Sequence, residues 1–121
     1  MNILIVDDSL IIRKNLNRFF TNLGHTVLGE AENGNDAIAK CKELENIDLI
    51  TMDITMPEMD GIETTKKIKE FLAEVTVVMI TSHGQEELVS SALKAGAKNF
   101  ILKPITEEKL SDTLQLLFPD A

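Results

Sequence analysis

Three acidic residues, one threonine and one lysine each follow closely on a short apolar run of the sequence; they are Asp7, Asp8, Asp53, Thr81 and Lys103. Carboxylates that lie close together repel one another, and a divalent cation relieves that repulsion. Mg²⁺ suits such a site because it takes oxygen ligands and retains waters and phosphate oxygens. A carboxylate can also act as a nucleophile and form an aspartyl phosphate, while a cation and a lysine neutralise the transferring group. The residue types therefore indicate phosphoryl transfer to an aspartate, provided that the fold gathers them.

The apolar runs predict the strands that must gather these side chains. Four of the five runs are continuous and rich in Ile, Val, Leu and Met, which indicates strands buried on both faces of a parallel sheet. The second run is weaker and is predicted to lie at a sheet edge. The five runs are Ile3–Val6, Thr26–Leu28, Leu49–Met52, Val75–Ile80 and Asn99–Leu102.

Apolar residues at helical spacing follow every run. In the first pattern they recur from Ile12 at i, i+4, i+7, i+8 and i+11, with Ser9 placed to cap the helix and Gly24 to end it. In the fourth pattern one apolar face, which is expected to face the core, is formed by Leu88, Val89, Ala92 and Leu93. The last pattern has Thr106 as its predicted cap. Strand and helix therefore alternate along the whole chain. This order predicts an α/β domain with a parallel sheet, helices on both faces and right-handed crossovers.

All five polar residues fall at one predicted edge of the sheet, where ligands of open parallel sheets bind. In the strand order 2-1-3-4-5, which is taken from known doubly wound folds, the first and third strands are neighbours. Asp7, Asp8 and Asp53 then crowd together, with Thr81 and Lys103 at the same edge. Any one of these residues is also what an ordinary solvated strand end carries. Their joint placement favours a site.

The composition limits the class of protein. The 121 residues suit one compact domain, 1–121, and a hydrophobic content of 44% suffices for a core. No apolar run approaches the ~18 residues of a membrane span, and the start MNILIVDD does not resemble a secretion signal. A net charge of −8 disfavours nucleic-acid binding, because phosphate backbones would be repelled. The single cysteine, Cys41, can form no internal disulfide, so a cytoplasmic protein is expected.

Four motifs carry a resemblance to a known family. The segments ILIVDDS, MDITMPEMDG, MITS and KAGAKNFILKP resemble, in order and spacing, the signatures of the receiver domain of bacterial response regulators, of the single-domain CheY type. The resemblance spans nearly the whole chain. It implies a flavodoxin-like (βα)5 fold with a doubly wound, five-stranded parallel sheet. It also implies a two-component signalling protein rather than an enzyme in the usual sense, one that catalyses only its own aspartyl phosphorylation and dephosphorylation.

The resemblance implies a role for each matched residue of the site. Asp53 matches the phosphoacceptor, and Asp7 and Asp8 match the acidic pair that holds Mg²⁺ together with Asp53. The backbone carbonyl of Thr55 matches a further metal ligand. Lys103 matches the lysine that contacts the phosphoryl group. The implied donor is a sensor histidine kinase or a phosphotransfer protein.

The resemblance also implies a switch. Thr81 matches the hydroxyl that moves towards the phosphoryl group, and Phe100 matches the aromatic residue that changes rotamer with it. The surface of the fourth helix, fifth strand and fifth helix would then change and control a protein partner, as in chemotaxis or at a flagellar motor. Thr55 and His83 occupy positions that tune the phosphoryl lifetime, and Pro104 matches a proline that often follows a cis peptide bond. No nucleic-acid contact and no membrane insertion are expected.

Other interpretations stay open at this point. The chain could be a receiver module excised from a longer regulator with a DNA-binding or enzymatic output domain. A Mg²⁺-dependent phosphatase fits less well, since such enzymes commonly carry a DxD pair after the first strand, whereas Asp7 and Asp8 are adjacent. A dinucleotide-binding domain is not supported, because no GxGxxG follows the first strand. A receiver-like scaffold that no longer takes phosphate is the last alternative.

Overall fold

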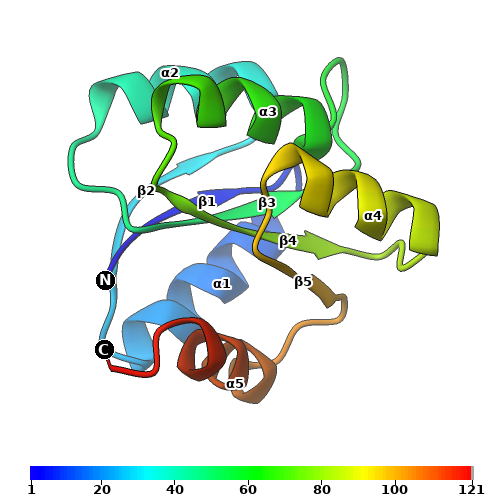
Figure 1. Cartoon of the computed structure of the whole chain (residues 1–121). Coiled ribbons are helices and arrows are strands. Elements are labelled where there is room, and N and C mark those ends of the chain that lie inside the picture. The colour runs from blue at the N-terminus through cyan, green and yellow to red at the C-terminus, as the bar shows by residue number, and fades with distance from the viewer. Residues whose placement is uncertain (121) are drawn as a thin grey trace.

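The structure is a computed structural model that describes residues 1–120, and strands and helices alternate along it (Figure 1). The strands are β1 (Asn2–Val6), β2 (Thr26–Ala31), β3 (Leu49–Asp53), β4 (Thr76–Thr81) and β5 (Asn99–Leu102). The helices are α1 (Leu10–Asn22), α2 (Gly34–Glu43), α3 (Gly61–Phe71), α4 (Glu86–Ala95) and α5 (Glu107–Leu117). The predicted alternation is confirmed. None of the helices in residues 1–120 combines the length and the apolar character that crossing a membrane requires.

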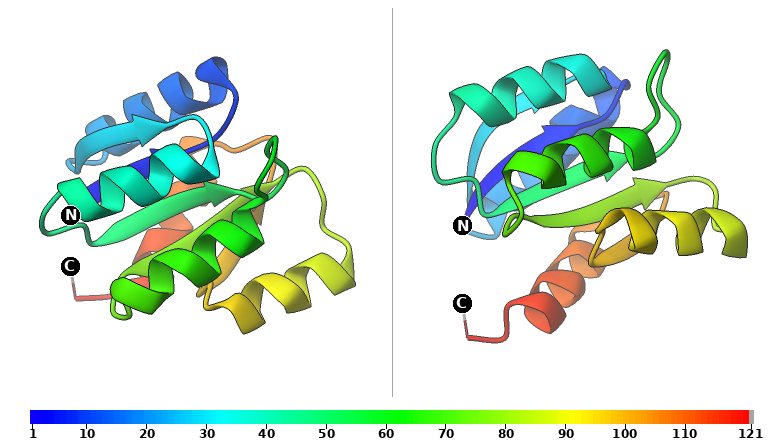
Figure 2. Two further views of the ribbon diagram at one scale, coloured as in Figure 1. Left: turned by 90° about the horizontal axis from the view of Figure 1, so that it is seen from above. Right: turned by 45° about the horizontal axis from the view of Figure 1, so that its top comes forward.

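The strands form one parallel sheet in the order β2-β1-β3-β4-β5, as predicted. Figures 1 and 2 show three layers, with α2, α3 and α4 on one face of the sheet and α1 and α5 on the other. The weak second run lies at the sheet edge, as its pattern indicated. Because β1 and β3 are central neighbours, the residues that follow them leave the sheet side by side.

Alternate residues of the central strands supply two separate cores. Leu4 and Val6 belong to the cluster under α2, α3 and α4, whereas Ile3 and Ile5 belong to the cluster over α1 and α5. All four side chains are at most 1% exposed. Each such side chain contributes roughly 1.5–3 kcal/mol by its burial. The central strands that carry the candidate site are thus held from both faces.

Two predictions of burial are wrong. The fifth run was predicted to be buried on both faces, but β5 is an edge strand and Leu102 is 44% exposed. Leu93 was predicted on the buried face of the fourth helix and is 47% exposed, while Ala92 and Ala95 face the core. β5 is the last strand of the sheet, and α4 is the last helix of the layer that it forms with α2 and α3 (Figure 1). An apolar sequence pattern does not reveal which strand or helix lies last in a layer.

Side-chain caps fix the starts of α1, α2, α3 and α5. Ser9 Oγ accepts a hydrogen bond from the Ile12 amide at 3.3 Å, and Thr106 Oγ1 accepts one from the Lys109 amide at 3.1 Å, as the sequence predicted. Asp60 caps α3 in the same way, which the sequence analysis did not identify. The Lys103–Pro104 peptide bond is cis, as the resemblance implies.

Candidate functional site

Three carboxylates meet beyond the carboxyl ends of β1 and β3. Asp53 is the last residue of β3, and Asp7 and Asp8 follow β1, whose Val6 is paired with Met52. One oxygen from each of Asp7, Asp8 and Asp53 lies within 4.8 Å of the others. Asp7 and Asp53 are buried, with 1% and 4% exposure, whereas Asp8 is exposed. The cluster is therefore buried on one side and open to solvent on the other.

Lys103 supplies the positive charge of this cluster. Its Nζ lies 3.0 Å from Asp7 Oδ2 and 3.4 Å from Asp53 Oδ1, and the lysine side chain is 16% exposed. Its backbone N–H donates to Thr81 O at 2.8 Å, which fixes the residue beside the end of β4. Burial alone would lower the pKa of Lys103, but the contacts with Asp7 and Asp53 outweigh burial and raise the pKa. The ammonium stays charged.

The electrostatics of Asp53 are unfavourable without a cation. Burial, followed by the charge of Asp7, raises the pKa of Asp53 to about 7, although Lys103 acts in the opposite direction. A hydrogen bond with Asp8 and the charge of Asp8 raise this pKa further. One lysine therefore does not compensate three close carboxylates. A bound divalent cation would.

The donor set fits Mg²⁺. Asp7 Oδ1 accepts a hydrogen bond from the Ser9 amide at 2.9 Å. Among residues 1–120, the buried Asp7 Oδ2 has no hydrogen-bond partner, although Lys103 Nζ forms an ion pair with it at 3.0 Å. Such an oxygen is free to ligate a cation. All the candidate side-chain ligands are carboxylate oxygens, which are hard ligands. Mg²⁺ prefers a site with a small number of carboxylates and several positions left for water or phosphate oxygens over a site enclosed entirely by protein.

The other predicted residues lie in the loop after β3, at the end of β4 and on β5. Thr55 lies in the loop between β3 and α3 and is exposed. Thr81 ends β4 and is fully buried, and its Oγ1 accepts a hydrogen bond from the His83 amide at 3.0 Å. Phe100, on β5 opposite Met79, is half-buried and packs against the core cluster under α2, α3 and α4. Phe100 is thus on the same side of the sheet as α4.

Two features of the site were missed by sequence reasoning. A Cβ at Gly61 would lie 2.0 Å from the backbone oxygen of Asp53, so only glycine lets α3 begin this close to the end of β3. The Gly61 amide donates to Ile54 O at 2.7 Å across the same loop. Arg13 Nη1 donates to the carbonyl of Asp7 at 2.7 Å from α1. The glycine after Asp60 was visible in the sequence, but nothing there marked Arg13.

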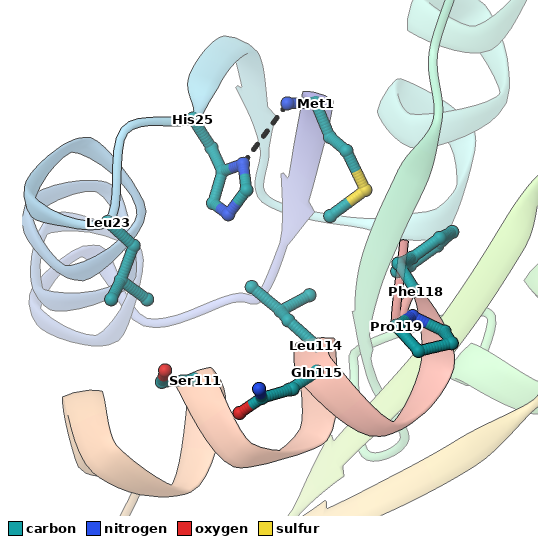
Figure 3. A pocket seen from close by; sticks show the side chains of 8 residues that line it. All are labelled: Met1, Leu23, His25, Ser111, Leu114, Gln115, Phe118 and Pro119. Carbon is teal, nitrogen blue, oxygen red and sulfur yellow. Dashed lines mark hydrogen bonds between the residues drawn. The ribbon is translucent and has the colours of Figure 1, made fainter. Parts of the chain in front are cut away.

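A small acidic cavity of about 290 Å³ lies beside Asp8. Asp8, Glu32 and Glu58 contribute carboxylates to its lining, together with Asn33 and Pro57. A second cavity, of about 300 Å³, lies between α1 and α5 near the start of the chain and contains none of the predicted site residues (Figure 3). There His25 is half-buried, and its Nδ1 accepts a hydrogen bond from the Met1 amine at 3.1 Å.

Comparisons with known proteins agree with this geometry. The sequence model of the response regulator receiver domain matches residues 3–115. The chemotaxis protein CheY of Bacillus subtilis is 44% identical over 112 residues, which are 93% of this chain and 92% of that protein. The transcriptional regulatory protein YdfI of Bacillus subtilis is 40% identical over 113 residues, which are 93% of this chain but 52% of that protein.

A solved structure extends the agreement to the fold. The CheX–CheY–BeF₃–Mg²⁺ complex from Borrelia burgdorferi contains a chain with a TM-score of 0.93 and 42% identity, and the match covers 98% of this chain and 89% of that one. Family model, relatives and fold all point the same way. The chain belongs to the receiver domain family of response regulators, and its relatives include chemotaxis proteins of the CheY type.

Proposed function

We propose that this chain is a phosphorylation-switched signalling domain that accepts a phosphoryl group on Asp53 from a histidine kinase or a phosphotransfer protein. The observation that carries the proposal is the convergence of Asp7, Asp8 and Asp53 within 4.8 Å, with Lys103 Nζ in contact with two of them. When bound, Mg²⁺ supplies positive charge against the carboxylates and the phosphoryl oxygens. Its ligands would be Asp7, Asp8, Asp53 and the carbonyl of Thr55.

In the proposed reaction an ionised oxygen of Asp53 attacks the phosphorus of a phosphohistidine. A phosphorus–oxygen bond forms, the phosphorus–nitrogen bond breaks, and the leaving imidazole takes up a proton from solvent. Lys103 neutralises charge on the phosphoryl oxygens as they pass from donor to acceptor. Because Asp53 is buried and Asp8 is exposed, the donor is expected to approach from the side of Asp8. The chain thus catalyses its own modification and acts on no other substrate.

The proposed output is a change of surface. A phosphoryl group on Asp53 would draw the Thr81 hydroxyl away from the His83 amide, and the space released would let Phe100 move inward. Both residues lie next to the surface formed by α4, β5 and α5, where Leu93 and Leu102 are already partly exposed. That surface would bind a protein partner in one state only. The chemotaxis relatives support a partner in flagellar control.

The proposal also covers the domain organisation, the location and the mode of signalling of the protein. We propose a single receiver domain over residues 1–121, located in the cytoplasm, that signals by protein contact and binds neither nucleic acid nor membrane. The net charge of −8 supports the absence of a nucleic-acid surface.

The test is intact mass after incubation with acetyl phosphate, with and without Mg²⁺. The wild-type chain should gain one phosphoryl group only with Mg²⁺, and Asp53→Asn should gain none. Asp60→Asn is the matched control, since Asp60 lies in the same loop and is exposed. Because a receiver that requires a protein donor would not react with acetyl phosphate, a second arm uses phosphorylated histidine phosphotransfer proteins. No gain in either arm from folded protein overturns the proposal.

A second candidate is supported by the YdfI match. There the matched region is 52% of a transcriptional regulator, so the same domain can serve inside a longer chain. In that case phosphorylation would control an attached output domain rather than a separate partner. An immunoblot of native cells distinguishes the two, because a band at 13.4 kDa fits the stand-alone domain and a larger band fits the longer regulator.

A further inference from the structure

Arg13 links helix α1, strand β2 and the loop after β1 that carries Asp7 and Asp8. From α1 its Nη1 donates to the carbonyl oxygen of Asp7 at 2.7 Å, and its Nε donates to Glu30 Oε1 on β2 at 3.2 Å. The side chains of Arg13 and Glu30 are only 12% and 18% exposed. Exposed ion pairs contribute little, but a shielded pair with fixed geometry is screened less by solvent. The planar guanidinium is suited to bridging two acceptors at once.

Glu30 is itself held in place. Lys14 Nζ lies 3.2 Å from Glu30 Oε2, and Asn17 Nδ2 donates to the same oxygen at 3.1 Å. Burial alone would raise the pKa of Glu30, but the hydrogen bonds from Asn17, Lys14 and Arg13 outweigh burial and lower the pKa. The carboxylate is therefore ionised at neutral pH, and both of its oxygens are engaged. Arg13 is anchored to a fixed acceptor rather than to a mobile one.

The carbonyl that Arg13 holds belongs to the peptide between Asp7 and Asp8. That peptide is planar, so fixing its oxygen also fixes the direction in which the chain continues to Asp8. The Asp7 amide donates to Ala31 O at 3.1 Å, which fixes the other side of the residue. The orientation of the exposed Asp8 carboxylate towards Asp53 therefore depends on the hydrogen bond from Arg13.

We propose that Arg13, held by Glu30, is a positioning residue that orients the Asp7–Asp8 peptide and thereby sets the affinity of the site for Mg²⁺. This inference rests on the proposed function in one respect, namely that the three carboxylates bind Mg²⁺. Groups that orient metal ligands typically change metal affinity by about 10–100-fold when they are removed. A loss of about tenfold or more is expected for Arg13→Met.

The sign of the change separates positioning from simple electrostatics. Arg13 carries a positive charge close to an acidic cluster, so charge alone would make Arg13→Met bind Mg²⁺ more tightly. Positioning requires weaker binding. Lys14→Met is the matched control, because Lys14 lies on the same helix and contacts Glu30, and its removal changes the net charge equally. In Lys14→Met, Glu30 keeps its hydrogen bonds from Arg13 and Asn17, so the contact between Arg13 and Asp7 is expected to remain.

The experiment is calorimetric titration of Mg²⁺ into the full chain and its variants, with circular dichroism to confirm that each is folded. Arg13→Met should bind at least about tenfold more weakly than wild type, and Lys14→Met should bind equally or more tightly. Arg13→Lys keeps the charge but cannot bridge Asp7 and Glu30 with one amine, so it should fall between wild type and Arg13→Met.

Arg13→Met with unchanged or tighter Mg²⁺ binding overturns the positioning role while leaving the proposed function intact. Wild-type Mg²⁺ affinity in Arg13→Lys would show that the bridge between Asp7 and Glu30 is not needed, and this result would also overturn the positioning role. If Arg13→Met does not fold, the comparison of Arg13→Lys with Lys14→Met decides, since weaker binding is expected only in the former. A wild-type chain that binds no Mg²⁺ overturns both this inference and the Mg²⁺-dependent function.

Discussion

Lys103 Nζ lies 3.0 Å from Asp7 Oδ2, which is nearer than its contact of 3.4 Å with Asp53 Oδ1. The lysine therefore compensates the charge of Asp7 as well as that of the proposed phosphoacceptor. Within residues 1–120 the same Asp7 oxygen accepts no hydrogen bond. Lys103 therefore contacts two of the carboxylates that we propose as ligands of Mg²⁺. Lys103 is expected to exchange its contact with Asp7 for one with the phosphoryl group only when Mg²⁺ is bound and compensates the charge of Asp7.

Lys103→Met should have opposite effects on metal binding and on phosphorylation. Removing the ammonium raises the negative charge of the cluster, so Mg²⁺ should bind several-fold more tightly. The rate of phosphoryl gain should fall at least about tenfold, because the transferring oxygens lose a positive partner. Calorimetry and time-resolved intact mass measure the two effects. Lys109→Met, at an exposed lysine of α5, is the control and should change neither. Parallel losses of both properties would contradict the assignment of Lys103.

Asp53→Asn should stabilise the metal-free protein at neutral and alkaline pH. The pKa of Asp53 rises from its ordinary value of 3.8 to about 7 on folding, mainly through burial. Between these values the unfolded chain binds fewer protons than the folded one, so wild-type stability falls as pH rises from about 4 to about 7. Above that window the variant should be more stable by roughly 1–3 kcal/mol, and below it the difference should vanish.

Urea unfolding in EDTA at a series of pH values measures this difference. Adding Mg²⁺ should raise the stability of wild type more than that of Asp53→Asn, because the variant has lost a ligand. Equal pH dependence of the two proteins in EDTA would show that Asp53 ionises normally in the folded state.

Gly61→Ala should disturb the site through the backbone. The added Cβ would lie 2.0 Å from Asp53 O, and the atoms involved are main-chain, so strand and helix must separate. A cost of about 3 kcal/mol is expected, with weaker Mg²⁺ binding as the carboxylate shifts. Gly29→Ala is the control, since its Cβ would meet Leu44 Cδ1 at an ordinary 3.5 Å. Thermal unfolding and calorimetry compare them, and equal effects would be inconsistent with the close approach at Gly61.

Thr81→Ala should separate the switch from the chemistry. The Thr81 hydroxyl is fully buried and bound to the His83 amide, so its loss should cost about 1–2 kcal/mol. Asp53, Asp7 and Asp8 are untouched, and phosphoryl gain should persist. The change at Phe100 on phosphorylation, followed by NMR of a fluorinated phenylalanine, should be lost. Thr81→Ser keeps the hydroxyl and should therefore retain the change at Phe100 on phosphorylation. A full response at Phe100 in Thr81→Ala would exclude the proposed coupling.

Much of the fold could be predicted because the determining interactions are local or periodic. Continuous apolar runs predicted the central strands, and Ser9 and Thr106 predicted helix starts, since a cap acts within three residues of itself. The pairing of Asp7 and Asp8 with Asp53 followed once a strand order was assumed. That order came from known folds. Propensity and periodicity do not determine which strands become neighbours.

The sequence by itself determined the residue types of the site and the strands that end on them. Only the tertiary structure decided that Leu102 lies on an edge strand, that Gly61 must lack a side chain, and that Arg13 reaches the carbonyl of Asp7. Each of these depends on contacts between segments that are distant or irregularly spaced along the chain. A strand pattern reports how much apolar surface must be buried, whereas the partner that buries it is fixed by packing of the whole domain.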